Sequence, residues 1–102
     1  MEQSSTAKTK TRRKNYAVWE RIVEKNPEYG VAFINFTIRF PMLSPQAVRV
    51  AVLVRSFPSW MIGNMLCIAE HTVENLRYEI RKKLGIIHDD KLPGILLAMS
   101  LN

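Results

Sequence analysis

The chain has 102 residues with 15 Lys or Arg against 9 Asp or Glu, a net charge of +6. This length supports one small domain with a modest core, and 47% hydrophobic residues exclude a wholly disordered or fibrous chain. No run approaches the ~18 apolar residues that a membrane-spanning helix needs. The polar, basic N-terminus lacks the apolar stretch of a secretory signal. We therefore expect neither a membrane protein nor a secreted one.

Residue types that build metal centres and catalytic sites are scarce. The chain has two histidines and one cysteine, Cys67, which cannot form an internal disulfide and is typical of a reducing cytosol. His88 precedes Asp89-Asp90, which we interpret as a capping loop, and His71 has no neighbouring residue that would complete a metal site. The sequence therefore predicts no metal, no cofactor and no enzymatic activity.

Most of the excess positive charge lies in the first fourteen residues. That segment has a net charge of +4, whereas residues 15–102 carry ten basic and eight acidic side chains. Because it is rich in Ser, Thr and Lys, we expect a disordered tail. It is either a solubilising tail or an arm that contacts DNA phosphates, where each neutralised phosphate releases a counterion. The phosphate-contacting arm would consist of Lys8, Lys10, Arg12, Arg13 and Lys14.

Apolar residues recur with helical spacing from residue 15 onwards. One stripe begins at Trp19 and is interrupted at Asn26-Pro27, because proline disfavours the helical conformation of the residue before it. A second stripe over 29–40 carries aromatic residues about one turn apart and ends at Phe40-Pro41. We assign these aromatic side chains to the core or to a seam between helices rather than to a ligand site.

Ser44-Pro45 is a helix start signal, since serine caps well and proline suits the first helical position. The run Val48–Val54 that follows contains four valines and would also suit a buried strand. We predict a helix because of the start signal and the helical surroundings. Phe57-Pro58 ends it, and a short helix follows from Ser59 to about residue 67.

The next element is a long helix from Glu70 to Leu84. Val73, Leu76, Ile80 and Leu84 share one face, basic residues crowd its last two turns, and Gly85 supplies the stop. Asp90 is expected to cap a final short helix. The predicted fold class is therefore all-α.

Two helices joined by a short turn at Cys67-Ile68-Ala69, the second longer and basic, follow the helix-turn-helix plan. In that plan the second helix lies in the major groove of DNA with its N-terminal residues near base edges. Many helical bundles contain such a pair, so the plan alone is weak evidence.

The residue strings around this pair are more specific. Leu43-Ser44-Pro45, Leu66-Cys67-Ile68, Thr72-Val73-Glu74 and the phrase from Arg77 to Gly85 resemble the LuxR-type helix-turn-helix family of bacterial transcription regulators. The likeness covers about 43–101. With Trp19, Pro27-Glu28-Tyr29 and Phe40-Pro41 it reaches back to about residue 19, as in the subgroup at the C-terminus of larger sensor-regulators.

The resemblance implies a four-helix domain over 42–102, whose third helix reads the major groove and whose fourth helix often forms a dimer. The N-terminal helical extension of one or two helices then spans 15–41 and the basic tail 1–14. The implied partner is double-stranded DNA, bound by a homodimer in the bacterial cytoplasm at the nucleoid. The expected DNA-binding residues are His71, Thr72, Glu74, Asn75, Arg77, Tyr78, Arg81 and Lys82, and the expected dimer face is Ile95, Leu96 and Met99.

Several positions depart from the family. Ala47 replaces a capping-box Glu, Pro58 and Ala69 replace caps, and Trp60-Met61 replaces a pair that helps to hold phosphate. Ser59 is expected to cap one residue late, and Gly63 in place of Ala is expected to be a conservative change.

These departures favour a second interpretation, a degenerate helix-turn-helix that serves as an adaptor between proteins. An exposed patch would then bind the partner. The residues expected to form it are Trp60, Met61 and Met65.

Overall fold

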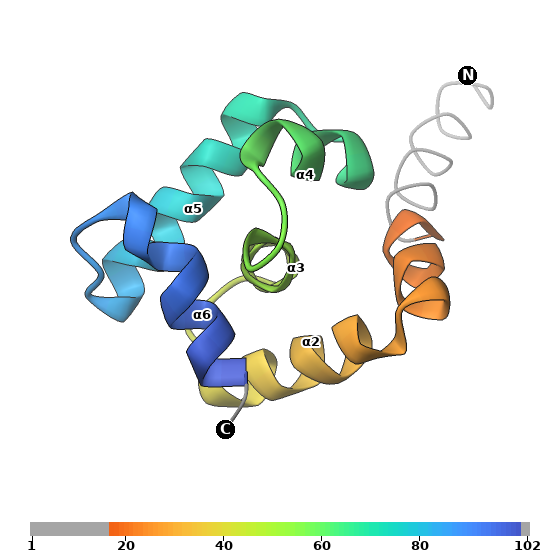
Figure 1. Ribbon diagram of the computed structural model, residues 1–102, viewed down its shortest axis with the longest axis horizontal. Helices are drawn as coiled ribbons and strands as arrows, with labels where there is room; N and C mark the ends of the chain where they lie inside the picture. The colour runs from red at the N-terminus through yellow and green to blue at the C-terminus, as the bar shows by residue number, and fades with distance from the viewer. Residues whose placement is uncertain (1–16, 101–102) are drawn as a thin grey trace, which may run out of the picture.

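A computed structural model describes residues 17–100, which contain helices and turns but no strand (Figure 1). The fold class is all-α. In chain order the elements are helical residues 17–25, α2 (Pro27–Arg39), α3 (Pro45–Val54), α4 (Ser59–Leu66), α5 (Glu70–Leu84), the 3-10 helix η1 (Asp89–Lys91) and α6 (Leu92–Ser100). The predicted basic arm lies outside the described residues. No described helix is long and apolar enough to cross a membrane.

Helix α3 forms the centre of the molecule, with α2, α4, α5 and α6 packed around it (Figure 1). The Ser44 hydroxyl accepts a hydrogen bond from the Ala47 amide at 3.2 Å, and Pro45 occupies the first helical position. The valines of α3 are at most 2% exposed. A helix that is apolar on all sides is stable only when it is surrounded. The start signal therefore correctly predicted a helix where valine propensity favoured a strand.

Helix α2 connects the N-terminal segment to the same core. Pro27 stands in its first turn, after Asn26, and Phe36 on its inner face is fully buried. The rings of Trp19 and Phe33 lie 5.5 Å apart between their centroids, which ties residues 17–25 to α2. Trp19 and Phe36 belong to one continuous apolar cluster with the residues of α3 to α6. The extension and the remaining helices thus share a single core.

The end of the chain departs from the prediction. Asp90 does not cap a helix; it lies inside η1, and α6 begins only at Leu92. Leu96 is completely buried against the rest of the protein, so its assignment to a dimer face was wrong. Ile95 and Met99 are half-buried, and the Met99 carbonyl accepts a hydrogen bond from Arg39 Nη1 at 2.6 Å. The side of α6 that carries Leu96 is therefore used within the fold.

Candidate nucleic-acid interface

Helices α4 and α5 are joined by a tight turn. Cys67 ends α4 in the left-handed conformation, with φ of 59°. The amide of Ile68 donates to the Gly63 carbonyl at 2.9 Å, which closes the last turn of α4. Ala69 then adopts an extended conformation, and its carbonyl accepts from Thr72 N (3.0 Å) and Val73 N (3.2 Å) to start α5. Two helices joined by a short turn therefore lie where the sequence predicts them.

The two helices approach one another closely at Gly63. A Cβ atom at this position would lie 2.8 Å from the Ile68 carbonyl oxygen and 3.4 Å from the Glu70 nitrogen. Both are backbone atoms, which cannot rotate away as a side chain does. The prediction that glycine in place of alanine is a conservative change here is wrong. The backbone of the turn packs directly against the backbone of Gly63, which leaves no space for a Cβ atom.

The inner face of α5 holds the helix on the core, and Val73 and Ile80 are fully buried. Gly85 ends the helix with φ of 72°. On the opposite side, exposed residues follow at spacings of four, three and four. We call this set the outer stripe: His71, Asn75, Tyr78 and Lys82. Thr72 and Glu74 are exposed beside it.

Side chains within the outer stripe are in contact with one another and with Arg81. Asn75 Nδ2 and His71 Nε2 lie 3.4 Å apart. The Tyr78 ring has the Arg81 guanidinium 5.4 Å and the Lys82 ammonium 5.8 Å from its centroid. These cation–π contacts gather two positive charges around one exposed aromatic ring. The second half of the stripe is therefore basic, as a surface for phosphate requires.

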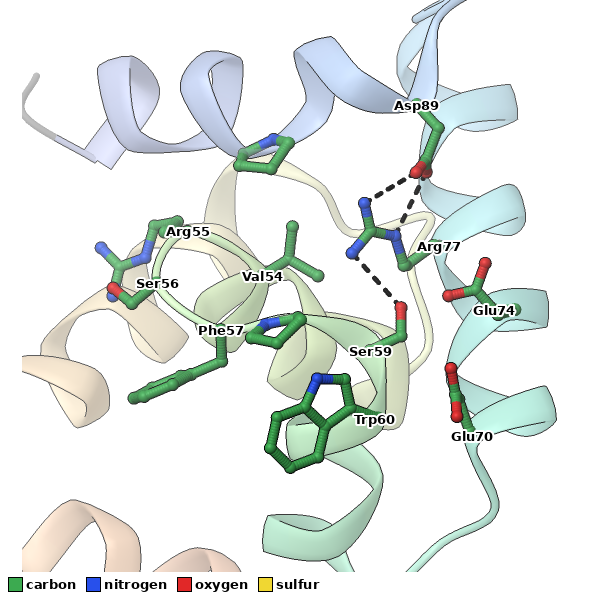
Figure 2. Close-up of a pocket in the computed structure, with 12 residues that line it drawn as sticks. Val54, Arg55, Ser56, Phe57, Ser59, Trp60, Glu70, Glu74, Arg77 and Asp89 are labelled. Atoms are coloured by element: carbon green, nitrogen blue, oxygen red, sulfur yellow. Dashed lines mark hydrogen bonds and ion pairs between the residues drawn. The ribbon is translucent and has the colours of Figure 1, made fainter.

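Arg77 does not lie on this exposed face. It is 8% exposed, and its guanidinium makes two hydrogen bonds with the Asp89 carboxylate, Nη2 to Oδ2 at 2.8 Å and Nε to Oδ1 at 3.2 Å (Figure 2). Nη1 also donates to the Ser59 hydroxyl at 3.4 Å. The family resemblance predicts Arg77 on the DNA-contacting face, and this prediction is wrong: its partners place it between α5, α4 and η1.

Ser59 was also misassigned as a delayed cap. Pro58 holds the N-cap position of α4 without a side-chain hydrogen bond, and Ser59 is the first helical residue. Its hydroxyl is buried and accepts from Arg77 instead. α5 likewise has no side-chain cap, because Ala69 occupies that position.

Arg81 and Lys83 of α5 also have polar partners within the protein. Arg81 Nε lies 3.3 Å from Asp89 Oδ1, and Arg81 Nη1 donates to the Ile87 carbonyl at 3.2 Å. Lys83 Nζ donates to the Met42 carbonyl at 2.8 Å. Asp89 thus binds two arginines of α5. Sequence reasoning did not identify it, because helical periodicity carries no information about a partner in the following loop.

Trp60 borders a cleft of about 550 Å³ between α4, α5 and η1 (Figure 2). The Trp60 side chain is at the rim and the residue is 53% exposed, whereas Met61 and Met65 are half-buried. Glu70 and Glu74 line the α5 side of the cleft. The structure therefore leaves Trp60 as the most exposed member of the expected partner patch.

Among residues 17–100 there is no group of three or more His, Cys, Asp or Glu side chains that could hold a metal ion. His88 and Asp89 belong to the loop that leads into η1, where Asp89 binds the arginines of α5. No protein-family model, curated protein or solved structure matches the chain.

Proposed function

We propose that this chain is a bacterial transcription regulator of the LuxR type that binds double-stranded DNA through α4 and α5. The observation that carries the proposal is the outer stripe: a helix held on the core by one face presents polar and basic side chains on the other, directly after a tight turn. The sequence resemblance to the family supports the same assignment. Such a protein acts at the nucleoid in the cytoplasm.

In the proposed complex, α5 enters the major groove with its first turns toward base edges. His71, Thr72 and Asn75 are exposed in those turns. A carboxamide such as that of Asn75 pairs well with the N6 and N7 groups of adenine, and the imidazole of His71 can donate or accept. These residues would determine which sequence is preferred.

The second half of α5 would contact the phosphates. Lys82 is exposed, and Arg81 and Lys82 both lie against the Tyr78 ring, which limits the side-chain freedom that binding would otherwise remove. Glu74 is exposed beside the stripe and would oppose phosphate contact on its flank. The net affinity therefore depends on these cations and on the arm of residues 1–14.

Titration of the full chain against labelled random duplex DNA at several salt concentrations tests the proposal. Lys82→Ala should weaken binding to all sequences alike and reduce the slope of log affinity against log salt by about 0.9. Lys25→Ala removes the same charge from an exposed position outside α4 and α5 and is the control. Asn75→Ala should instead change the preference between sites, by about 1–3 kcal/mol for one lost base contact. Equal affinity of wild type and Arg81→Ala/Lys82→Ala would refute the proposal.

A second function, that of a protein-interaction adaptor, is favoured by the exposure of Trp60 beside a cleft that Glu70 and Glu74 line on the α5 side. Large exposed aromatic side chains dominate the energy of many protein interfaces. DNA affinity and partner binding, measured on the same variants, distinguish the two functions. For a DNA-binding regulator, Trp60→Ala leaves DNA affinity unchanged. For an adaptor, wild type binds no duplex DNA, and Trp60→Ala abolishes a complex that Lys82→Ala retains.

A further inference from the structure

Helix α2 has two apolar faces, of which the protein covers only one. Ala32 and Phe36 are buried on the inner face, against α3. Val31, Ile34 and Ile38 stand on the other side of the helix and are 59%, 58% and 73% exposed. We call these three residues the outer seam. Figure 1 shows α2 along one edge of the molecule, with α3 on its inner side.

The outer seam has the spacing of a helix–helix contact. Its members follow at intervals of three and four residues, which is the repeat with which one helix packs against another. Beside Ile34 lies a cleft of about 390 Å³ whose wall includes Trp19, Val23 and Phe33. Contiguous exposed apolar surface of this kind is typical of a surface that binds a protein.

We infer that a second copy of this chain covers the outer seam, with the two α2 helices antiparallel and crossing at Ile34. Ile34 is the middle member of the seam, so a two-fold axis beside it brings the two Ile34 side chains together. The same axis places Ile38 of each copy opposite Gly30 of the other, four residues on either side of the crossing. The room for the incoming isoleucine is the cleft that Gly30 and Ile34 line, since the space beside the Gly30 Cα is already filled by Val23, whose Cγ1 would lie 2.8 Å from a Cβ atom there.

Charge on α2 favours the antiparallel arrangement. Glu28 lies in the first turn and Arg39 in the last turn, and helical spacing puts both on the same flank of the outer seam. A two-fold axis across the seam joins like flanks and opposite ends, so the exposed Glu28 of each copy stands at the same end of the seam as Arg39 of the other. Arg39 Nη1 donates to the Met99 carbonyl of its own chain, and its other guanidinium N–H groups are the donors for Glu28. A parallel pair would instead bring like charges to the same end. The surface is thus complementary to itself, as a two-fold interface requires.

The composition of the basic tail favours a second copy over the chain's own N-terminal residues as the occupant. Residues 1–14 contain no large apolar residue other than Met1. Such a segment has little apolar area with which to cover Val31, Ile34 and Ile38. Another copy of α2 provides three matching side chains.

Disulfide formation between introduced cysteines tests the geometry directly. The exposed Cys67 is first replaced, as Cys67→Asn, because asparagine tolerates its left-handed backbone. In this background Ile34→Cys should form a covalent dimer with itself. Val31→Cys and Ile38→Cys should each crosslink poorly alone but efficiently when the two proteins are mixed. Ile87→Cys, at a position 81% exposed away from α2, is the control for random collision.

The oligomeric state of the full chain provides the second readout. Wild type should sediment as a concentration-dependent dimer, and Ile34→Glu should raise the dissociation constant at least about tenfold, with Ile87→Glu as the matched control. A wild type that is monomeric at all concentrations would overturn the inference. Efficient self-crosslinking at all three seam positions would overturn the antiparallel arrangement. Dimerisation that appears only after deletion of residues 1–14 would show that the tail covers the seam.

The inference does not rest on DNA binding, and the two can fail separately. If the chain is a monomer that binds DNA, only the inferred dimer through the outer seam is refuted. A dimer that fails to bind duplex DNA would refute the proposed function alone.

Discussion

Arg77 and Asp89, twelve positions apart in the sequence, form a bidentate ion pair that connects α5 to η1. The pair is unevenly buried, because the Arg77 side chain is 10% exposed and that of Asp89 is 44% exposed. Loss of either partner therefore has different consequences. Arg77 without Asp89 would be a charge enclosed by protein, whereas Asp89 without Arg77 would still be hydrated.

We predict that Asp89→Ala destabilises the protein more than Arg77→Met. Asp89→Ala leaves the buried guanidinium of Arg77 without its counter-ion and should lower the free energy of unfolding by about 3 kcal/mol. This is the lower end for a broken buried ion pair, because Asp89 is partly exposed. Arg77→Met keeps the apolar stem of the side chain and should cost about 1 kcal/mol. Urea unfolding measures both, with the exposed neighbour Asp90→Ala as the control. Equal losses for Asp89→Ala and Arg77→Met would contradict the assigned asymmetry.

The uncapped start of α5 can be repaired by one substitution. Ala69 already has the extended backbone of a capping residue but provides no acceptor, so Ala69→Ser should stabilise the protein by about 0.5–2 kcal/mol. Ser44→Ala, which removes the existing cap of α3, should lower stability by a similar amount. The midpoints of denaturant unfolding check both. An unchanged midpoint for Ala69→Ser would mean that the added hydroxyl does not reach the free amides of α5.

The left-handed residue in the α4–α5 turn carries backbone strain that glycine would relieve. Cys67 is the only non-glycine residue with positive φ within residues 17–100. That conformation costs an L-residue about 1–2 kcal/mol, partly offset by the larger entropy of glycine in the unfolded chain. Cys67→Gly should therefore raise stability by about 0.5–1 kcal/mol. Gly85→Ala, where φ is 72° and no atom would touch the new Cβ, should lower it by a similar amount in thermal unfolding.

The basic tail can be tested by deletion. Removal of residues 1–14 takes away five cations and, apart from Met1, no large apolar side chain. If those cations contact DNA, the slope of log affinity against log salt should become shallower by about 0.9 for each lost phosphate contact. Circular dichroism should report an unchanged helical fold. An unchanged slope and affinity would assign the segment a solubilising role.

Local signals predicted most of the fold. Ser44-Pro45 and Gly85 mark the beginning of α3 and the end of α5 because caps and stops act within one turn, where sequence and geometry are directly linked. The valine run of α3 was correctly predicted as a helix from the Ser44-Pro45 start signal and the helical surroundings, against the preference of valine for strands. The helix is stable because α2, α4, α5 and α6 pack around α3, and the propensity of a single residue type contains no information about such packing.

The site was less predictable, for a physical reason. The family resemblance selected His71, Asn75 and Lys82, and they are exposed because the opposite face of α5 is strongly apolar. Arg77 lies at the edge of that apolar face, where periodicity does not decide between solvent and interior. Its burial depends on Asp89, in a loop whose path cannot be deduced from the periodicity of α5. Leu96 was misassigned for a different reason: an apolar side chain fits a protein core and a dimer interface equally well.

The close contact between Gly63 and the backbone of the α4–α5 turn limits which sequences can keep this fold during evolution. Any side chain there must displace the carbonyl of Ile68, so α4 and α5 cannot keep their relative position after a substitution. Gly94, by contrast, has an ordinary backbone conformation, and a Cβ atom at that position would meet nothing within 4 Å. Among descendants of this chain, position 94 is therefore free to drift through many residue types. Position 63 admits a new residue only together with a compensating change in the turn.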